Sequence, residues 1–344
     1  MKKLRRLFST KIITILAPIL AFSIFTSTTY ATEVENKTVN REFEFTNLPS
    51  TKAIQNFDYA SKNEVFVTQR KDGDTYLSRC IIYDNGKAER KDYIVLKNYG
   101  HGESIEVIKE NGKTYIWIGN TANELENPNG KTYYWSKDIS RIEYVVDPSC
   151  KTKARVGEVK TITNIENVSS SPEGKAFRSA VAIADGNDRI CFRTQIDNSS
   201  RSTYYGVYKL SEINKVLNST TKTKINMSTF ASSKVSYFKN LKCPNGSFQG
   251  FDITGVGSNN KFLYIYGGAE GETPTIYKYL YTNGGNYTHV KTIKIKGSYV
   301  GKLEAEGIKV ETNLNTNKEN IFISFKPQKD EDGKLKPFRL YSFE

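Results

Sequence analysis

Five related stretches of sequence decide the fold: QNFDY at residues 55–59, ESIEV at 103–107, SAVAI at 179–183, QGFDI at 249–253 and EGIKV at 306–310. Each begins with a polar residue and continues, after one spacer, with two apolar residues that flank a third position. Alternation with a period of two is typical of a β-strand that buries one face. The sequence therefore predicts an internal repeat whose unit begins with a short strand.

Further strand-like runs follow each copy of this stretch. In the first copy they are 65–67, 80–83 and 93–96, with the hairpin signal Asn85-Gly86 before the last run. The fifth copy lacks a fourth run, whereas a spare alternating run, 41–46, precedes the first copy. We therefore expect an all-β fold, a five-bladed β-propeller closed by this N-terminal strand pairing with 339–343. A β-sandwich or a pair of β domains is the alternative.

The composition agrees with a β fold. Tyr and Phe, at 22 and 18 residues, greatly outnumber Met and Trp, at 2 each, and aromatic side chains favour strands. This composition argues against a helical bundle or a coiled coil. One short surface helix is expected in the third repeat, where 210–217 has helical spacing with Ser211 as a candidate N-cap.

Residues 1–31 have the features of a secretory signal peptide. A basic start is followed by an apolar run over 12–25 and by Thr29-Tyr30-Ala31, a suitable cleavage site. The apolar run is short for the ~20 residues that span a bilayer, which disfavours a membrane anchor. We expect a single propeller domain at 32–344 that is secreted and is either released or held at the cell wall.

The chain carries a formal net charge of +13, and the predicted signal peptide accounts for only part of it. Positive charge attracts polyanions such as teichoic acid or acidic glycans. Because the lysines are scattered along the whole chain, we favour a basic surface spread over hairpin tips. An exported protein meets envelope polymers, so nucleic acid is not an expected partner, and nothing in the sequence supports membrane contact.

The chain has too few metal-binding and redox motifs to suggest a cofactor. His101 and His289 are the only histidines, so the sequence offers almost nothing from which to build a histidine-rich zinc site or a conventional Ser-His-Asp triad. The four cysteines form no CxxC motif, and their three pairings cannot be distinguished by sequence. Cys80 and Cys191 lie in strand-like runs and are expected to be buried, whereas Cys150 and Cys243 lie in loops that a disulfide could join. We expect no metal and no cofactor.

The polar residue that opens each repeat defines a candidate ligand site. In a propeller the first strand of each blade lines the central channel, so these residues would form a ring at one mouth. The ring consists of Gln55, Glu103, Ser179, Gln249 and Glu306, and His101 and Arg178 lie close enough in sequence to join it. Carboxylates and amides there could bind a sugar or a cation. The alternative is that they only satisfy channel waters and backbone amides.

Catalysis is less expected than binding. Glu103 and Glu306 could form a glycosidase pair, but the ring contains no compact cluster of three acidic residues, and no catalytic residue is assigned.

Short motifs at the strand starts suggest a family. GHGESIE at 100–106, WSKDISRI at 135–142, SFQGFD at 247–252 and EAEGI at 304–308 resemble the helveticin J family of large class III bacteriocins. More distantly, the pattern is similar to propellers of phage receptor-binding proteins and of teichoic-acid systems. The signal peptide is not a constant feature of that family.

The resemblance implies a secreted antibacterial protein that binds a cell-envelope glycan or a teichoic-acid-like polymer of Gram-positive bacteria. We expect it to act as a monomer. A glycan-cleaving enzyme on the same fold, and a secreted carbohydrate-binding or adhesive module that does not kill, are the alternatives.

We predict that the secreted protein begins at Thr32, because cleavage should follow Ala31. N-terminal sequencing of the protein recovered from the culture medium checks this, and a secreted product that begins at Met1 would show that the prediction is wrong.

Overall fold

The computed structural model describes residues 32–126, 130–255, 261–297, 300–313, 316 and 318–344. The predicted signal peptide, residues 1–31, lies outside the described residues. The described chain is all-β, as expected from the sequence, with one α-helix and short 3-10 turns.

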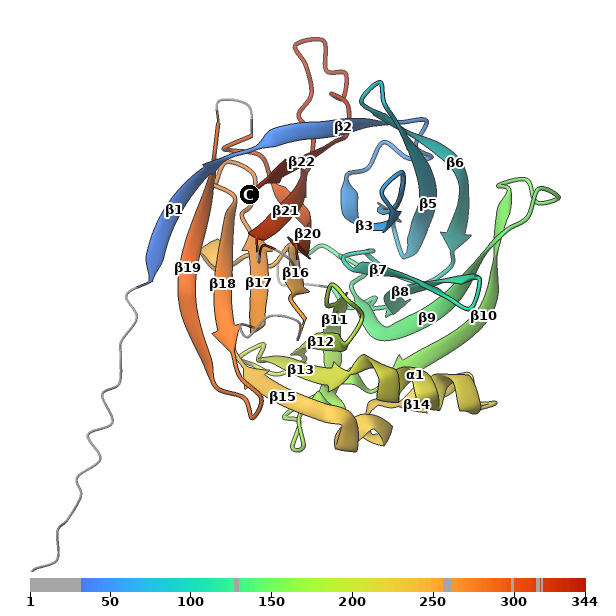
Figure 1. Ribbon diagram of the computed structural model, residues 1–344, viewed down its shortest axis with the longest axis vertical. Helices are drawn as coiled ribbons and strands as arrows, with labels where there is room; N and C mark the ends of the chain where they lie inside the picture. The colour runs from blue at the N-terminus through green and yellow to red at the C-terminus, as the bar shows by residue number, and fades with distance from the viewer. Residues whose placement is uncertain (1–31, 127–129, 256–260, 298–299, 314–315, 317) are drawn as a thin grey trace, which may run out of the picture. The chain divides into compact units, whose positions relative to one another are not determined.

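Most of the strands form antiparallel meanders that follow one another along the chain (Figure 1). The first contains β3 (Ile54–Ser61), β4 (Glu64–Lys71), β5 (Asp74–Tyr83) and β6 (Lys87–Leu96). The second contains β7 (Ile105–Glu110), β8 (Lys113–Ala122), β9 (Ser136–Val146) and β10 (Ala154–Thr163). The third contains β11 (Ala176–Ile183), β12 (Arg189–Ile196), β13 (Thr203–Lys209) and β15 (Lys234–Lys239).

The remaining strands complete the array. The next meander contains β16 (Gly250–Ile253), β17 (Lys261–Gly267), β18 (Thr275–Tyr281) and β19 (Tyr287–Lys296). The last contains β20 (Ala305–Asn313), β21 (Lys318–Phe325) and β22 (Arg339–Phe343). Three further strands lie outside these meanders in sequence: β1 (Glu33–Thr38), β2 (Asn40–Thr46) and β14 (Lys224–Asn226).

The meanders surround a common axis. Their first strands, which lie innermost in Figure 1, contact one another in the closed order β3, β7, β11, β16, β20 and back to β3. A layer of buried apolar side chains fills the space between each pair of neighbouring meanders. Trp117 and Phe192, for example, meet between the second and the third. Each sheet therefore buries both faces, which makes the architecture propeller-like.

The N-terminal segment closes this array. β2 pairs antiparallel with β22, with Arg41 opposite Tyr341, and parallel with β6, with Phe45 opposite Ala88. The pairing of 41–46 with 339–343 that the sequence predicts is thus present. It joins the last meander and the first into one eight-stranded sheet, one of four sheets in the described part of the chain. β1 adds a parallel strand to the outer edge of β19.

An insertion in the third meander differs in detail from the sequence prediction. It holds the helix α1 (Leu210–Ser219) and then β14, which pairs with β10 of the neighbouring sheet. Lys209, not Ser211, is the N-cap, and it makes no side-chain capping hydrogen bond. Leu210, Ile213 and Leu217 bury the apolar face of the helix.

The four cysteines are free thiols in the structure. Cys80 and Cys191 are buried among apolar side chains, as their strand positions suggest. Cys150 and Cys243 are half-buried and are not joined. Within the described residues, no helix has the length and hydrophobicity required to cross a membrane.

We predict that deleting residues 32–47 removes much of the stability, because β2 buries Phe43 and Phe45 between the first and last meanders. Burial of two such side chains contributes about 3–6 kcal/mol. Thermal unfolding should therefore shift down by several degrees and become less cooperative.

A shorter deletion of residues 32–38 is the control. It removes only the edge strand β1, so its melting temperature should stay closer to that of the parent. Equal melting of the parent and the 32–47 deletion would contradict closure by β2.

Candidate functional site

The residues predicted to form a polar ring lie near one end of the innermost strands. Gln55, Ser179 and Glu306 are near the starts of β3, β11 and β20, and Gln249 directly precedes β16. Glu103 lies two residues before β7. The structure does not bring all five into one cavity.

Gln55, Gln249, Glu306 and His101 line one polar cavity of about 520 Å³. The other lining residues are Lys52, Ala53, Arg70, Asp72, Lys131, Tyr133, Glu304 and Lys326. Hydrogen-bonding groups of several kinds thus converge on a space large enough for a sugar unit.

β-Bulges direct two of these side chains towards the cavity. Gln55 is the extra residue between the pairs Ile54–Gln69 and Asn56–Thr68. Glu306 and Gly307 lie together between two successive pairs of β20 and β21. A bulge turns a side chain away from the regular alternation of the strand. Gly307 is required at its position because a Cβ there would lie 2.8 Å from the Cα of Asn56.

Glu306 is the most unusual group in the cavity. The residue is only 6% exposed, and its carboxyl makes no hydrogen bond to another described residue. Burial and then the nearby Glu304 raise the pKa of Glu306 well above the usual range, although Lys326 opposes them. Lys326 is itself bound to Glu304 (2.8 Å) and Glu270 (3.1 Å). A raised pKa favours the protonated carboxyl, which can donate a hydrogen bond.

His101 presents a second neutral group. Its Nδ1 lies 2.8 Å from the carbonyl oxygen of Tyr133. A carbonyl only accepts, so Nδ1 carries the proton and Nε2 is left as an acceptor. Burial lowers the pKa of His101 even though Glu103 opposes this, which favours the neutral ring.

Glu103 and Arg178 form an ion pair instead of lining the cavity. Arg178 donates from Nε to Glu103 Oε2 (2.8 Å) and from Nη2 to Oε1, and Nη2 also donates to the carbonyl of Phe248 (2.7 Å). The guanidinium lies 4.5 Å from the Trp135 ring centre and 5.1 Å from that of Phe248. Burial alone would raise the pKa of Glu103, but Arg178 outweighs burial and lowers it. This pair connects three consecutive meanders.

Ser179 also makes a hydrogen bond between two neighbouring sheets. Its hydroxyl donates to the carbonyl of Lys137 (2.8 Å), lies 2.9 Å from Thr194 Oγ1, and is only 2% exposed as a residue. The bulge of β11 falls at Phe177, two residues earlier than the bulge of β3, so Ser179 follows the regular alternation and does not line the cavity.

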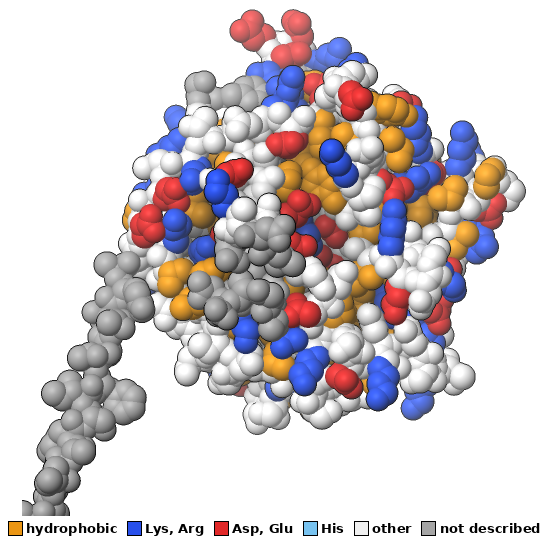
Figure 2. All heavy atoms as spheres, viewed as in Figure 1, with side chains coloured by type: hydrophobic (Ala, Val, Ile, Leu, Met, Phe, Trp, Pro, Cys, Tyr) orange, Lys and Arg blue, Asp and Glu red, His pale blue; other side chains and the backbone are white. Residues whose placement is uncertain are grey.

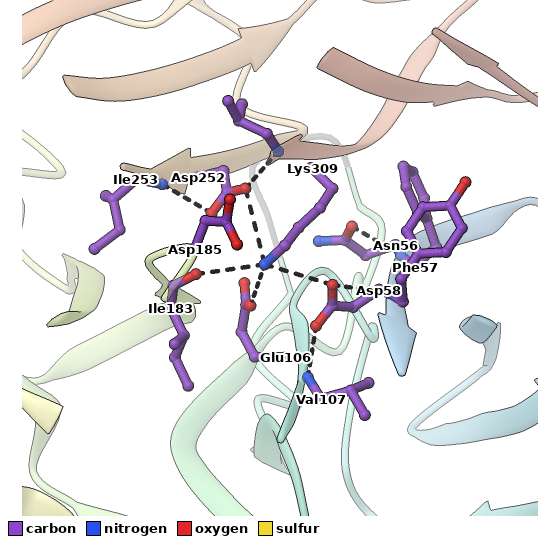
Figure 3. A network of polar contacts seen from close by, with 12 residues as sticks. Asn56, Phe57, Asp58, Glu106, Val107, Ile183, Asp185, Asp252, Ile253 and Lys309 are labelled. Carbon is purple, nitrogen blue, oxygen red and sulfur yellow. Dashed lines mark hydrogen bonds and ion pairs between the residues drawn. The ribbon is translucent and has the colours of Figure 1, made fainter. Parts of the chain in front are cut away.

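Sequence reasoning missed a second set of residues, three positions further along each repeat. There the copies have Asp58, Glu106, Ala182, Asp252 and Lys309, and the four charged side chains meet on the axis (Figure 3). The same repeat contains the signal, because four of its five copies have a charged residue at this position.

Lys309 is the centre of this cluster (Figure 3). Its Nζ lies 2.5 Å from Glu106 Oε2, 3.5 Å from Asp58 Oδ1 and 3.9 Å from Asp252 Oδ2, and it donates to the carbonyl of Ile183 (3.4 Å). Burial alone would lower the pKa of Lys309, but the three carboxylates outweigh burial and raise it. The lysine is therefore charged.

The carboxylates of the cluster are held differently. Asp58 and Asp252 each accept hydrogen bonds from two backbone N–H groups, one of the next residue and one of a neighbouring strand. For Asp58 the donors are Tyr59 and Val107. For Asp252 they are Ile253 and Val310. Glu106, in contrast, accepts its hydrogen bond from the side chain of Lys309. Burial raises the pKa of Asp58, raises that of Asp252 to about 7, and raises that of Glu106 well above its usual range.

A second cavity, of about 540 Å³, lies at the end of β20. It is lined by Asp185, Glu311, Thr312 and other polar residues, and Asp185 accepts a hydrogen bond from the Thr312 N–H (2.8 Å). Figure 2 shows acidic side chains gathered near the middle of one face, with basic side chains spread around the rim. Within the described residues, no group of His, Cys, Asp or Glu side chains is arranged to hold a metal ion.

Together, the fold and the cavity define the chain as a propeller-like protein with a polar cavity on its axis. Residues 33–298 match the family model for bacteriocin helveticin-J. The chain belongs to that family, which confirms the resemblance seen in the short motifs. A comparison with curated proteins gives no match.

Solved structures of similar fold include the tail fiber of Staphylococcus aureus phage P68. It is 15% identical, with a TM-score of 0.50, over 89% of this chain and 52% of the fiber. An exo-β-1,3-galactanase from Phanerochaete chrysosporium is 10% identical, with a TM-score of 0.48, over 89% of this chain and 63% of the enzyme. An α-L-arabinofuranosidase from Lactobacillus brevis is 9% identical, with a TM-score of 0.49, over 89% of this chain and 93% of the enzyme. The chain spans about half of the tail fiber, and this likeness shows the fold alone.

We predict that Lys309→Met destabilises the fold more at pH 7.5 than at pH 5. Without the ammonium, three buried carboxylates lose their counterion, which costs about 3–5 kcal/mol when they are ionised. A carboxyl whose pKa is higher in the folded chain than in the unfolded chain makes stability fall as the pH rises through that interval. Denaturant unfolding at the two pH values measures the difference.

Two variants complete this test. Lys318→Met removes an exposed lysine that lies 3.3 Å from Glu344, so the free energy of unfolding should change by less than about 1 kcal/mol. Adding Glu106→Gln to Lys309→Met should recover part of the loss. If Lys309→Met lowered the free energy of unfolding equally at both pH values, the charges of the cluster would not be the cause of the loss.

Proposed function

We propose that this chain is a secreted bacteriocin of the helveticin-J type that binds a glycan or a teichoic-acid-like polymer of the target cell envelope in its axial cavity. The observation that carries the proposal is the convergence of Gln55, Gln249, Glu306 and His101 on that cavity. Amides, a protonated carboxyl and a neutral imidazole both donate and accept hydrogen bonds, as hydroxyl groups require.

An aromatic surface beside the polar groups supports a sugar ligand. Tyr133 lines the cavity and stacks on Trp135, with ring centres 4.9 Å apart and an interplanar angle of 9°. Both rings are half-buried. Ligand sites commonly combine an apolar or aromatic wall with a few placed polar groups.

The architecture proposed for this function is one five-bladed propeller domain at 32–344. The closed order of the innermost strands and the apolar layer between each pair of neighbouring meanders support it. A monomer secreted into the medium, or held at the Gram-positive cell wall, fits this architecture and the predicted signal peptide.

Glycan cleavage is the second candidate, because the pKa of Glu306 is raised whereas that of Glu103 is lowered. Such a contrast is typical of an acid paired with a nucleophile or a base. However, both carboxylate oxygens of Glu103 accept hydrogen bonds from Arg178, which favours binding over cleavage. Release of reducing ends from purified walls separates the two functions.

We predict that Glu306→Ala combined with Gln249→Ala weakens binding to purified Gram-positive walls at least tenfold, a loss of about 1.4 kcal/mol or more. The melting temperature should change little, because neither side chain has a hydrogen bond to another described residue. Sedimentation of the protein with walls, together with thermal unfolding of the same sample, measures both properties.

Glu311→Ala is the matched control, since Glu311 is a carboxyl of raised pKa that lines the other cavity. It should bind walls like the parent. A folded double variant with the parent's wall affinity would exclude the axial cavity as the site. A zone-of-inhibition assay with the same variants then separates a killing protein from an adhesive one.

A further inference from the structure

A separate groove of about 520 Å³ lies where the first and second meanders meet at their outer strands. It is lined by Asn47, Glu89, Arg90, Lys91, Lys151, Thr152 and Lys153. These residues come from three segments: the end of β2, the strand β6 and the loop between β9 and β10. None of them belongs to the axial cavity.

The groove has a strong excess of positive charge. Four of its lining residues are cationic and one, Glu89, is acidic; Glu89 is paired with Lys91 at 3.2 Å. The axial cavity instead combines four Lys and Arg residues with three Asp and Glu residues. The positive charge of the groove is therefore not balanced by its own acidic residues.

The loop that carries two of the lysines is rigidly held. Hydrogen bonds close it from Cys150 N to the Asp147 carbonyl (3.0 Å), from Lys153 N to the Cys150 carbonyl (2.9 Å) and from Asp147 N to the Lys153 carbonyl (2.9 Å). Tyr93 N of β6 donates to the Thr152 carbonyl (3.1 Å), which fixes the loop to the first meander. Lys151 and Lys153 thus have defined positions beside β6.

Contacts within the protein hold the side chain of Arg90 in a defined orientation. Its Nε donates to the carbonyl of Asn47, and its guanidinium lies 4.8 Å from the centre of the Tyr93 ring. These contacts leave the four N–H groups of the two Nη atoms without a partner among the described residues. Lys151 and Lys153 likewise have no ion pair within the described part of the chain.

We propose that this groove binds the phosphate groups of an anionic polymer built from phosphodiester units. A fixed guanidinium beside lysines from a second segment suits a phosphate, whose oxygens accept from several donors at once. A membrane surface is disfavoured, because an interfacial site buries apolar side chains and the groove is lined only by polar ones. The proposal is independent of glycan binding at the axis.

Titration of the full secreted protein with soluble poly(glycerol phosphate), and with neutral dextran of similar length, tests the proposal. The groove variant Arg90→Gln, Lys151→Gln, Lys153→Gln should bind the phosphate polymer at least ~10-fold more weakly than the parent. The matched variant Lys62→Gln, Lys215→Gln, Lys222→Gln loses the same charge at exposed positions elsewhere and should stay within ~3-fold. Binding should weaken as salt is added, and dextran should not bind.

Three results would overturn the proposal. An equal loss of affinity for the phosphate polymer in the two triple variants would show that the polymer is attracted by the net charge alone. An unchanged groove variant would place phosphate binding elsewhere. Binding of the parent to phosphatidylglycerol vesicles but not to the polymer would assign the groove to lipid. Wall binding by the Glu306→Ala, Gln249→Ala variant is measured separately. A negative result for the axial cavity would therefore leave the test of the groove unaffected.

Discussion

Closure of the sheet array by β2 is the constraint on which the rest of the structure depends. β2 hydrogen-bonds at once to the C-terminal strand β22 and to β6 of the first meander. Only then does each sheet have a neighbour on both faces, and only then can its apolar side chains leave water. The axial cavity depends on the same closure, because Gln55 and Glu306 lie on strands that become neighbours when the first and last meanders meet.

The strands could be predicted from local apolar runs, and their closure could be predicted because the last copy lacks a fourth run while a spare run precedes the first copy. The run at 41–46 buries Phe43 and Phe45 and leaves its other side chains more exposed, whereas its partner at 339–343 is buried from Leu340 to Phe343. The route of the insertion in the third meander could not be predicted, since β14 leaves its own meander and pairs with β10. That choice depends on tertiary packing, which a local pattern does not contain.

The candidate site was predicted less completely, and β-bulges are the reason. A regular strand places every second residue on one face, but the extra residue at Gln55 lets Gln55 line the axial cavity while Asp58, three positions later, joins the cluster around Lys309. In β11 the bulge falls at Phe177 instead, and Ser179 turns into a contact between sheets. A polar residue marks the start of an innermost strand, whereas the position of the bulge decides where its side chain lies.

The charged cluster around Lys309 lies between the parts of β20 that line two different cavities. The single strand β20 contributes Glu306 to one cavity, Lys309 to the cluster, and Glu311 to the other cavity. Along β20, a cluster of buried ion pairs therefore lies between the residues that line two cavities of different charge. Because the two cavities share no lining residue, substitutions in one need not alter the other, and one scaffold presents two surfaces that can change independently.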